Sequence, residues 1–465
     1  MSGAATDARR AGCRPVTAEV SGWGRFPAAR TDLYRPERMR SLETAVGCAD
    51  TVLARGLGRS YGDACYNSAG ATVLMERLDR FLAFDSETGT LDCEAGVSFA
   101  QILETFVPRG FFPPVTPGTK FVTLGGALAC DVHGKNHHVD GSFSRHVLDF
   151  DLLAADGSVL RCSRTANPDL FRATAGGMGL TGIVTRVRLT LRRMETSYIS
   201  VDYERAANLG DALERLAARD AEYRYSVAWI DCLAQGPSLG RSVLMRGNPA
   251  GADETRDANV REPLRGMSTP RLRVPFDAPA SLLNRHSVRA FNGLYYRRYP
   301  ADARGRIVHF EPFFYPLDGI GDWNRLYGRR GFVQYQFVVP ADAAAAALED
   351  ALSLVSNAGA PSFLAVLKRF GNAEEAGLLS FPRPGYTLAL DLPWRGRDTE
   401  TLLRALDDVV VDAGGRVYFA KDARMRRELV GGMYPDLDEW RGIRDRIDPA
   451  GRFSSDLGRR LGLAE

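Results

Sequence analysis

The sequence predicts an α+β fold built as two domains, and three observations support this prediction. A chain of 465 residues favours two or three domains over a single hydrophobic core. Between residues 45 and 95, short apolar runs alternate with Gly and Asp turns, which is typical of strands in a compact unit. Between residues 332 and 413, strand patterns alternate with helix patterns, which favours a largely antiparallel sheet flanked by helices on one face. We place the first domain at residues 16–195 and the second at residues 196–412, after a disordered N-terminal stretch of residues 1–15.

The first domain shows strand patterns and one amphipathic helix. Ser98 is expected to open the helix, because apolar side chains recur on one face behind it, and Gly110 is expected to follow its end. Residues 149–160 predict a hairpin around a Gly turn, and residues 183–191 alternate as a half-buried strand does. Further strands are predicted at residues 51–55, 72–75, 81–84 and 91–94.

The second domain has strand patterns whose alternation assigns their faces. Strands are predicted at residues 225–231, 332–339, 363–368 and 386–392, and helices at residues 341–357 and 399–413. Gln334 and Gln336 share one face of their strand, and Thr387, Ala389 and Asp391 share one face of theirs, because strand side chains alternate with a period of two. We expect this polar face to line a cavity and the opposite, apolar face to pack on the helices.

Residues 241–306 break this order with a Pro-, Gly- and Arg-rich composition. The segment holds 13 arginines and 6 acidic residues, and it shows no clear period. We interpret it as a mobile, solvated loop on composition. The alternative is a lid that also contacts anionic lipid head groups or a substrate phosphate.

Bulk composition restricts the class of protein. With 45% hydrophobic and 25% charged residues the chain is an ordinary globular protein, and a net charge of +3 gives no support for nucleic-acid binding, so we expect none. Seven scattered cysteines without C-x-x-C spacing indicate neither a zinc site nor a disulfide framework. The sequence shows no signal peptide and no transmembrane run, so we expect a cytoplasmic protein or one held peripherally at the inner membrane.

Two glycine-rich stretches carry the functional signal. In residues 55–63, an apolar strand enters a turn whose N–H groups could hold a diphosphate. In residues 117–138, four glycines would let the backbone approach a flat or charged ligand, and four imidazole or amine groups crowd the last six positions. A metal cluster of His133, His137 and His138 is the weaker interpretation, because the spacing is not helical and no fourth ligand lies nearby.

These stretches resemble the FAD-binding half of the vanillyl-alcohol-oxidase (p-cresol methylhydroxylase) superfamily. The resemblance rests on residues 58–63, 125–127 and 131–138, and it continues nearly to the C-terminus. The sequence is similar there to flavin oxidases that act on polyprenylphosphoryl ribose, at residues 22–25, 334–337, 418–422, 448–449 and 455–456. The resemblance implies that the first domain binds FAD, that the second binds substrate, and that residues 413–465 return to the first domain. Helices are predicted in this last part at residues 425–431 and 437–447.

The resemblance also implies which residues contact the cofactor. Members that tether the flavin covalently carry His at the position of Arg59, so we expect FAD held without a covalent bond. The cofactor contacts implied are Gly56, Gly58, Arg59, Ser60, Tyr61, Gly118, Thr119, Thr123, Gly125, Gly126, Ala127, Cys130, Gly134, Asn136, His137, Gly179, Gly182, Ile183 and Tyr418.

For the reaction, the resemblance implies oxidation of the ribose 2′-hydroxyl of a polyprenylphosphoryl-β-D-ribose. Lys421 and His133 would orient or deprotonate that hydroxyl. The substrate contacts implied are Gln334, Gln336, Lys368, Trp229, Lys135, Phe370 and Ala389. An NAD-dependent short-chain reductase would reduce the ketone, which completes an epimerisation.

The pocket departs from the family pattern at Val227, Phe314, Ala365 and Thr387, where polar side chains are expected. An aldonolactone or alditol oxidase, or an enzyme acting on another glycosyl phosphate or a nucleoside, is therefore the alternative. A non-catalytic flavin- or lipid-phosphate-binding protein is a second alternative. Ala389 stands where related enzymes that nitroaromatic compounds trap covalently carry a cysteine.

Overall fold

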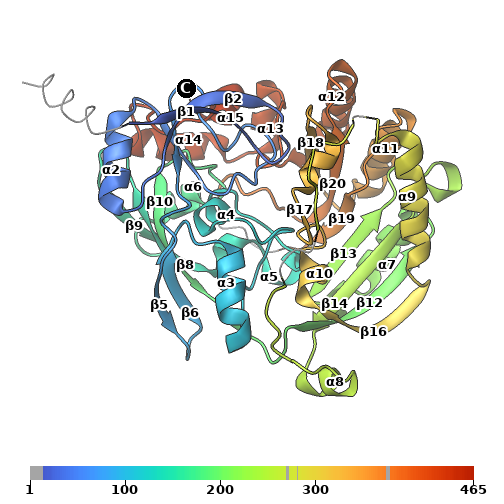
Figure 1. The fold of residues 1–465 in the computed structure, drawn as a ribbon. Coiled ribbons are helices and arrows are strands. Elements are labelled where there is room, and N and C mark those ends of the chain that lie inside the picture. The colour runs from blue at the N-terminus through green and yellow to red at the C-terminus, as the bar shows by residue number, and fades with distance from the viewer. Residues whose placement is uncertain (1–13, 269–271, 280, 373–376, 465) are drawn as a thin grey trace, which may run out of the picture.

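The computed structural model describes residues 14–268, 272–279, 281–372 and 377–464, and these form two lobes (Figure 1). The predicted disordered stretch of residues 1–15 lies almost wholly outside the described residues. The α+β class is confirmed, since each lobe combines antiparallel strands with helices. In Figure 1 the first lobe, drawn blue to teal, lies at the left, and the second, drawn green to orange, lies at the right.

The first lobe contains two sheets. One has the order β1-β2-β4-β3 and consists of β1 (Val16–Ser21), β2 (Ala28–Tyr34), β4 (Ala71–Leu74) and β3 (Val52–Arg55). The other has the order β5-β6-β10-β8-β9 and consists of β5 (Phe81–Asp85), β6 (Thr90–Glu94), β10 (Ile183–Thr190), β8 (Val147–Leu153) and β9 (Val159–Ser163). Neighbouring strands of this second sheet are antiparallel.

Helices cover these sheets, and their starts follow local sequence rules. Ser98 caps α3 (Phe99–Phe106) in a reciprocal capping box with Gln101, which satisfies two free donors at the first turn. The predicted apolar face of α3 is buried. The other helices of this lobe are α2 (Met39–Cys48), α4 (Leu124–Ala129), α5 (His137–Asp140) and α6 (Pro168–Thr174).

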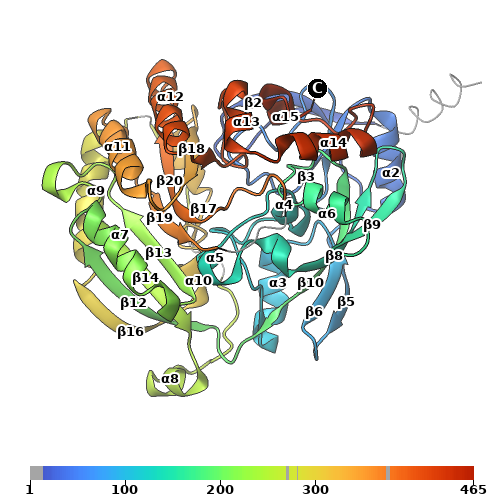
Figure 2. The same ribbon diagram turned by 180° about the vertical axis from the view of Figure 1, so that it is seen from behind.

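The second lobe is one eight-stranded sheet in the order β16-β12-β14-β13-β19-β20-β18-β21. Helices α7, α11 and α12 cover one face, as the reverse view in Figure 2 shows. Across β18 and β20, Gln334 lies opposite Asp391 and Gln336 lies opposite Ala389. The elements are β12 (Tyr198–Ala206), α7 (Leu209–Ala218), β13 (Tyr225–Ile230), β14 (Ser242–Pro249), β16 (Asp302–His309), β18 (Phe332–Val339), α11 (Ala344–Asn357), β19 (Ala365–Phe370), β20 (Gly385–Pro393), α12 (Arg397–Asp412) and β21 (Arg416–Val417).

The interpretation of residues 241–306 as a loop is wrong. Besides β14 and the start of β16, the segment contains α8 (Ala252–Asp257), β15 (Leu272–Arg273) and α9 (Arg285–Arg298). The composition suggested a solvated loop because several of the arginines pair with residues that are distant in the sequence. Such pairs cannot be recognised from the segment alone. Residues 269–271 and 280 of this segment lie outside the described residues, and its mobility stays a prediction.

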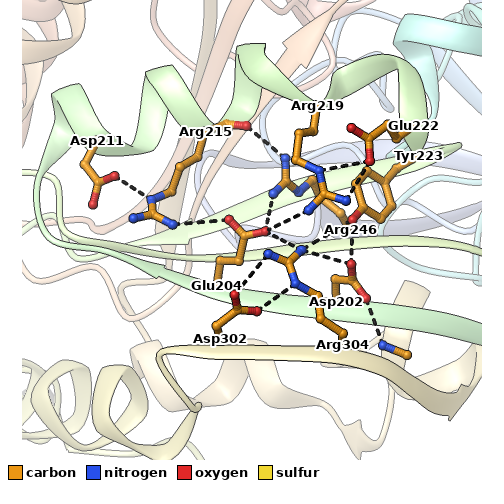
Figure 3. Close-up of polar contacts among 11 residues, drawn as sticks. Asp202, Glu204, Asp211, Arg215, Arg219, Glu222, Tyr223, Arg246, Asp302 and Arg304 are labelled. Atoms are coloured by element: carbon orange, nitrogen blue, oxygen red, sulfur yellow. Dashed lines mark hydrogen bonds and ion pairs between the residues drawn. The ribbon is translucent and has the colours of Figure 1, made fainter.

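An arginine–carboxylate network joins α7 to the outer strands of this sheet (Figure 3). Glu204 on β12 pairs with Arg246 on β14, and Arg304 on β16 lies 2.7 Å from the same carboxylate. The Arg246 side chain is 1% exposed and that of Glu204 is 5% exposed. We call this group the Glu204 network; its remaining members are Asp202, Asp211, Arg215, Arg219, Glu222, Tyr223 and Asp302.

The C-terminal helices α13 (Val430–Met433), α14 (Leu437–Ile447) and α15 (Asp456–Leu461) lie beside β1 and β2 in both views (Figures 1 and 2). The helix predicted at residues 425–431 is shifted: a 3₁₀ turn covers Arg427–Leu429 and α13 follows from Val430 to Met433. Phe453 joins the core around Val52, and Arg460 on α15 bridges Asp63 and Asp422 at 2.8 Å each.

Two remaining features concern cysteines and membrane helices. Cys48 is disulfide-bonded, which the cysteine spacing did not indicate. No helix among the described residues is long and apolar enough to span a bilayer.

Candidate active site

A cavity of about 700 Å³ lies where the two lobes meet, and both lobes contribute to its wall. The first lobe contributes the two glycine-rich stretches, and the second contributes side chains from β13, β18, β19 and β20. Lys421 enters from the turn after β21. The structure therefore brings together the two stretches and the polar face that the sequence singled out.

Glycines form one side of this cavity where side chains would not fit or would fill it. A Cβ atom on Gly56 would lie 2.2 Å from Thr123 Oγ1, so only glycine lets the two stretches approach. Gly58 has φ of 62°, which favours glycine, and a Cβ on Gly118 would meet nothing within 4 Å. The wall is thus made by backbone, as a flat ligand held closely would require.

Arg59 is a cation in this wall with a free donor. Its guanidinium stacks 3.9 Å from the Trp23 ring centroid, and its Nε atom is buried without a hydrogen-bond partner among the described residues. Burial lowers the pKa of Arg59, and Asp318 partly opposes that shift. A buried donor of this kind fits an anionic group such as a diphosphate.

His133 lies at the centre of a polar cluster on the second-lobe side. Lys368 Nζ lies 3.0 Å from His133 Nδ1, and Gln336 Nε2 lies 3.0 Å from His133 Nε2. Burial, together with the nearby Lys368, holds the pKa of His133 well below its usual value, so the imidazole is neutral. A neutral ring has one acceptor nitrogen, so with Lys368 donating to Nδ1 the Gln336 amide must present its oxygen to Nε2–H. The same oxygen can then accept from Thr387, whose Oγ1 lies 3.2 Å from the amide.

Lys421 faces the cavity above an aromatic ring and near a buried carboxyl group. Its Nζ atom lies 4.1 Å from the Tyr61 ring centroid. Burial lowers the pKa of Lys421 to about 8, and the charge of Asp391 opposes that shift. Burial likewise raises the pKa of Asp391 to about 7, although Gln334 donates a hydrogen bond to it. Lys421 can therefore gain or lose a proton near neutral pH.

Charge in the wall is one-sided. The described lining residues include seven basic side chains and one carboxylate: Arg55, Arg59, Lys135, Arg298, Arg306, Lys368 and Lys421, with Asp318. Such a cavity favours anionic ligands, because an anion bound there would stabilise the charged forms of Lys135, Lys368 and Lys421, whose pKa values burial lowers.

Most predicted site residues line this cavity, and some do not. Ala127 and Ile183 lie in the core of the first lobe, where they pack behind the wall. Asn136 donates to Pro114 O at 2.7 Å, and the buried ring of His137 packs 4.4 Å from that of Phe370. Phe370 in turn contacts the His133 ring at 4.8 Å, so Asn136, His137 and Phe370 support the wall from behind.

Other lining residues could not be recognised from the sequence. Tyr203, Tyr295, Arg298, Tyr299 and Arg306 belong to the cavity wall. Apart from Tyr203 they fall in the segment that was interpreted as a loop. Only the packing of α9 and β16 against the sheet brings them to the cavity, so no local pattern could have identified them.

Two histidines of the second glycine-rich stretch contact groups that do not form a metal site. His138 Nε2 lies 2.8 Å from Tyr223 O, and His133 is held by Lys368 and Gln336. Within the described residues, no group of three or more His, Cys, Asp and Glu side chains is placed to hold a metal ion.

Comparison with known families identifies the class of protein to which this geometry belongs. A family model described as an FAD binding domain matches residues 33–163, which contain both glycine-rich stretches. A second family model, described as D-arabinono-1,4-lactone oxidase, matches residues 330–461, which contain Gln334, Gln336 and Lys421. The protein is an FAD-dependent oxidoreductase.

Relatives narrow this class to a family. The chain is 39% identical over 459 residues to decaprenylphosphoryl-beta-D-ribose oxidase of Mycolicibacterium smegmatis, and the match covers 96% of this chain and 98% of that protein. It is 37% identical over 377 residues to an uncharacterized protein in the mprA 5′ region of Streptomyces coelicolor, covering 79% of this chain and 100% of that protein. Cytokinin dehydrogenase 2 of Arabidopsis thaliana is 32% identical over 179 residues, or 38% of this chain and 34% of its own. The chain belongs to the decaprenylphosphoryl-β-D-ribose oxidase family.

The residues present fit FAD. The cavity wall formed by Gly56, Gly58, Gly118, Gly125 and Gly126, called the glycine wall, can receive a flat ring. The unpaired Nε of Arg59 can donate to a diphosphate oxygen. Gly56, Gly58 and Arg59 would hold the diphosphate, and Gly118, Gly125 and Gly126 would lie along the ring. These assignments stay predictions of contact.

Gly126→Val should abolish FAD binding. A Cβ on Gly126 meets only Thr123 Oγ1, at 3.1 Å, so the added methyl groups must displace either the wall or the ligand. The flavin-to-protein absorbance ratio of the purified variant measures the loss. Gly442→Val on the exposed side of α14 is the matched control, since a Cβ there meets nothing within 4 Å. Full flavin occupancy in Gly126→Val would remove this stretch from the cofactor site.

Proposed function

We propose that the protein oxidises the 2′-hydroxyl of a polyprenylphosphoryl-β-D-ribose to a ketone. The observation that carries the proposal is the position of Lys421 and His133 in the same basic cavity as the glycine wall. The near full-length similarity to an oxidase named for that class of substrate supports it. Gln334, Gln336, Lys368 and Trp229, which also line the cavity, would position the sugar.

Oxidation of the alcohol must separate a hydride from a proton. The chemistry that FAD supplies when bound is acceptance of the hydride from the alcohol carbon. The chain must take the hydroxyl proton, and we assign this role to Lys421, which lines the cavity and whose pKa burial lowers to about 8. His133 is neutral, but both ring nitrogens have partners, so it positions the substrate together with Lys368 and Gln336.

The altered pocket positions give the alternative substrate class its strongest support. Val227 and Phe314 line the cavity, whereas Ala365 is fully buried in the core and Thr387 contacts Gln336. Only two of the four departures noted in the sequence therefore face a ligand. With the D-arabinono-1,4-lactone oxidase match over residues 330–461, they favour an aldonolactone or alditol oxidase as the second candidate function.

Anaerobic reduction of the bound flavin separates the candidates. The purified enzyme is mixed with a short-chain polyprenylphosphoryl ribose, with an alditol or with an aldonolactone, and bleaching of the flavin absorbance is followed. We expect rapid bleaching with the polyprenylphosphoryl ribose alone. Faster bleaching with the alditol or lactone would instead support an alditol or aldonolactone oxidase. No bleaching with any of these compounds would favour a non-catalytic flavin-binding protein.

The flavin would be held without a covalent bond, because Arg59 occupies the position where tethering members carry His. Acid precipitation should therefore release all flavin into the supernatant. A yellow pellet would contradict this.

Two further proposals concern partners and location. An NAD-dependent short-chain reductase acting on the released ketone would complete epimerisation, and it need not bind this chain stably. We also propose a cytoplasmic protein with peripheral membrane contact, since Leu282, Phe291 and Leu294 expose large apolar side chains on and before α9. A coupled assay with the reductase, and flotation with vesicles, test these two points.

Ala389→Cys should create a site for covalent trapping by nitroaromatic compounds. Ala389 lines the cavity between Gln336 and Val366 on the neighbouring strands, so a thiol there would face the reacting ligand. Cys130 also lines the cavity, but burial raises its pKa to about 11 and keeps it a weak nucleophile. Intact-protein mass spectrometry after turnover should show an adduct in the Ala389→Cys variant and none in the parent.

The same variant in a Cys130→Ala background is the control, because an adduct must persist there if residue 389 carries it. A parent that already forms the adduct, or a variant that oxidises substrate without forming it, would contradict the prediction.

A further inference from the structure

The cavity continues beyond the reaction site toward α9 and β16. An aromatic row leads outward: the Trp229 and Tyr295 rings are 4.5 Å apart, Tyr295 and Tyr299 are 5.2 Å apart, and Tyr299 and Tyr203 are 5.0 Å apart. All four rings belong to the cavity wall. We call the part lined by Tyr203, Tyr295 and Tyr299 the aromatic wing.

Two arginines stand at this wing without a counter-charge. Arg298 at the end of α9 and Arg306 on β16 both line the cavity. Neither side chain makes a hydrogen bond or an ion pair with another described residue, and both residues are exposed. A cation beside apolar surface that lacks an internal partner is available to an anionic ligand.

The strand itself directs Arg306 to the cavity. Between Ala303 and Arg306 the pairing of β16 with β12 shifts by a bulge, and Gly305 there has φ of 61°. The extra residue puts Arg304 on the face that α7 covers, where it pairs with Glu204 and Asp202 (Figure 3), and Arg306 on the opposite face, which carries Ala303 and Val308. Regular alternation would have placed both arginines on one face. Because of the bulge, the paired Arg304 and the unpaired Arg306 side chains lie on opposite faces of the sheet.

We infer that the aromatic wing is the binding site for an isoprenoid phosphate, with Arg298 and Arg306 holding the phosphate oxygens and the tyrosine rings holding the first apolar units of the chain. The inference rests on the proposed function, and it deepens it by naming what binds outside the sugar pocket. Guanidinium groups suit phosphate because their donors form a planar fork, and aromatic rings offer the apolar surface that a branched chain needs.

The test compares Arg298→Gln/Arg306→Gln with Arg297→Gln in the FAD-loaded enzyme. Arg297 is the exposed neighbour on α9 outside the cavity wall, so its replacement removes charge without touching the wing. The dissociation constants of farnesyl phosphate, farnesol and inorganic phosphate are measured by calorimetry. We expect the double variant to lose about tenfold or more in farnesyl phosphate affinity, the loss typical of removing a charge-assisted contact, and to bind farnesol as the parent does. Arg297→Gln should match the parent throughout.

A second variant tests the chain-binding half. Tyr299→Ala should weaken farnesyl phosphate and farnesol alike, because both carry the same isoprenoid chain. Equal farnesyl phosphate affinity in the parent and the arginine double variant would overturn the inference.

A membrane surface is the other source of phosphate groups. Flotation with phosphatidylglycerol vesicles distinguishes binding to lipid head groups from binding to an isoprenoid phosphate. If the double variant loses vesicle binding while its farnesyl phosphate affinity is unchanged, the arginines contact lipid head groups and the inference is wrong. The proposed function can fail separately. If the parent does not oxidise polyprenylphosphoryl ribose, an arginine-dependent affinity for farnesyl phosphate still supports the site.

Discussion

Lys421→Ala should retain bound FAD and lose turnover by roughly 10²- to 10⁴-fold, the range expected when a positioned general base is removed. The amine lines the cavity and contacts the Tyr61 ring, whereas the proposed diphosphate contacts at Gly56, Gly58 and Arg59 do not include it. Flavin absorbance checks the first half of this expectation, and the rate of anaerobic flavin reduction by substrate checks the second. Added ethylamine should restore part of the rate, because the truncated side chain leaves space for a small amine.

The pH dependence of the reductive step has a defined sign. A base must be neutral to accept a proton, and Lys421 becomes neutral above its pKa of about 8. The rate of the parent should therefore rise as the pH increases through about 8, and this rise should be absent in Lys421→Ala. Because the charge of Asp391 raises the pKa of Lys421, Asp391→Asn should move the rise to lower pH. A variant at position 421 that turns over within a few fold of the parent would refute the assignment.

Glu204→Gln should lower the free energy of unfolding by ~3–5 kcal/mol, the cost of leaving a buried charge without its partner. The change preserves side-chain shape but removes the carboxylate that pairs with Arg246, whose side chain is 1% exposed. Arg246 would still donate its hydrogen bond to Arg215 O, at 2.8 Å, but would lose its carboxylate. Denaturant unfolding followed by circular dichroism, with FAD held in excess, measures the effect.

Two further variants make this result specific. Glu222→Gln removes an exposed member of the Glu204 network, which pairs with Arg219 on the surface, and should leave the unfolding midpoint nearly unchanged. Replacing the buried pair by Glu204→Leu/Arg246→Met should recover much of the stability, because neither charge is then buried alone. Parental stability in Glu204→Gln would mean that water or another carboxylate already satisfies Arg246.

Local patterns predicted some parts of this protein well. The bounds of β18 and α14 agree with the sequence, because strict alternation and a helical apolar face mark them residue by residue. The glycine-rich stretches could be recognised because the glycines that let a ligand approach the backbone lie close together in the sequence. Gln334 and Gln336 could be assigned to the cavity because they share one face of an uninterrupted strand.

The remainder depends on contacts that distant segments make. β14 was interpreted as loop because Arg246 looks solvated until Glu204 on another strand is known. Arg306 was missed because a one-residue bulge sets its direction. Ile183 was assigned to the cofactor by motif position alone, yet it lies in the core of the first lobe.

Arg460 links two chain segments that carry residues of the proposed site. Asp63 ends the turn that contains Arg59 and Tyr61, and Asp422 directly follows Lys421, so one guanidinium on α15 fixes both backbone segments. A hydrogen bond from Tyr61 N to Ala420 O, at 3.1 Å, ties them again. Separating the two segments would break these contacts, so room for a bulky ligand is gained more readily on the opposite side, where α9 and β16 border the cavity. Proteolytic nicking between α14 and α15 would accordingly loosen both segments in a single event, because it would free the helix that carries Arg460.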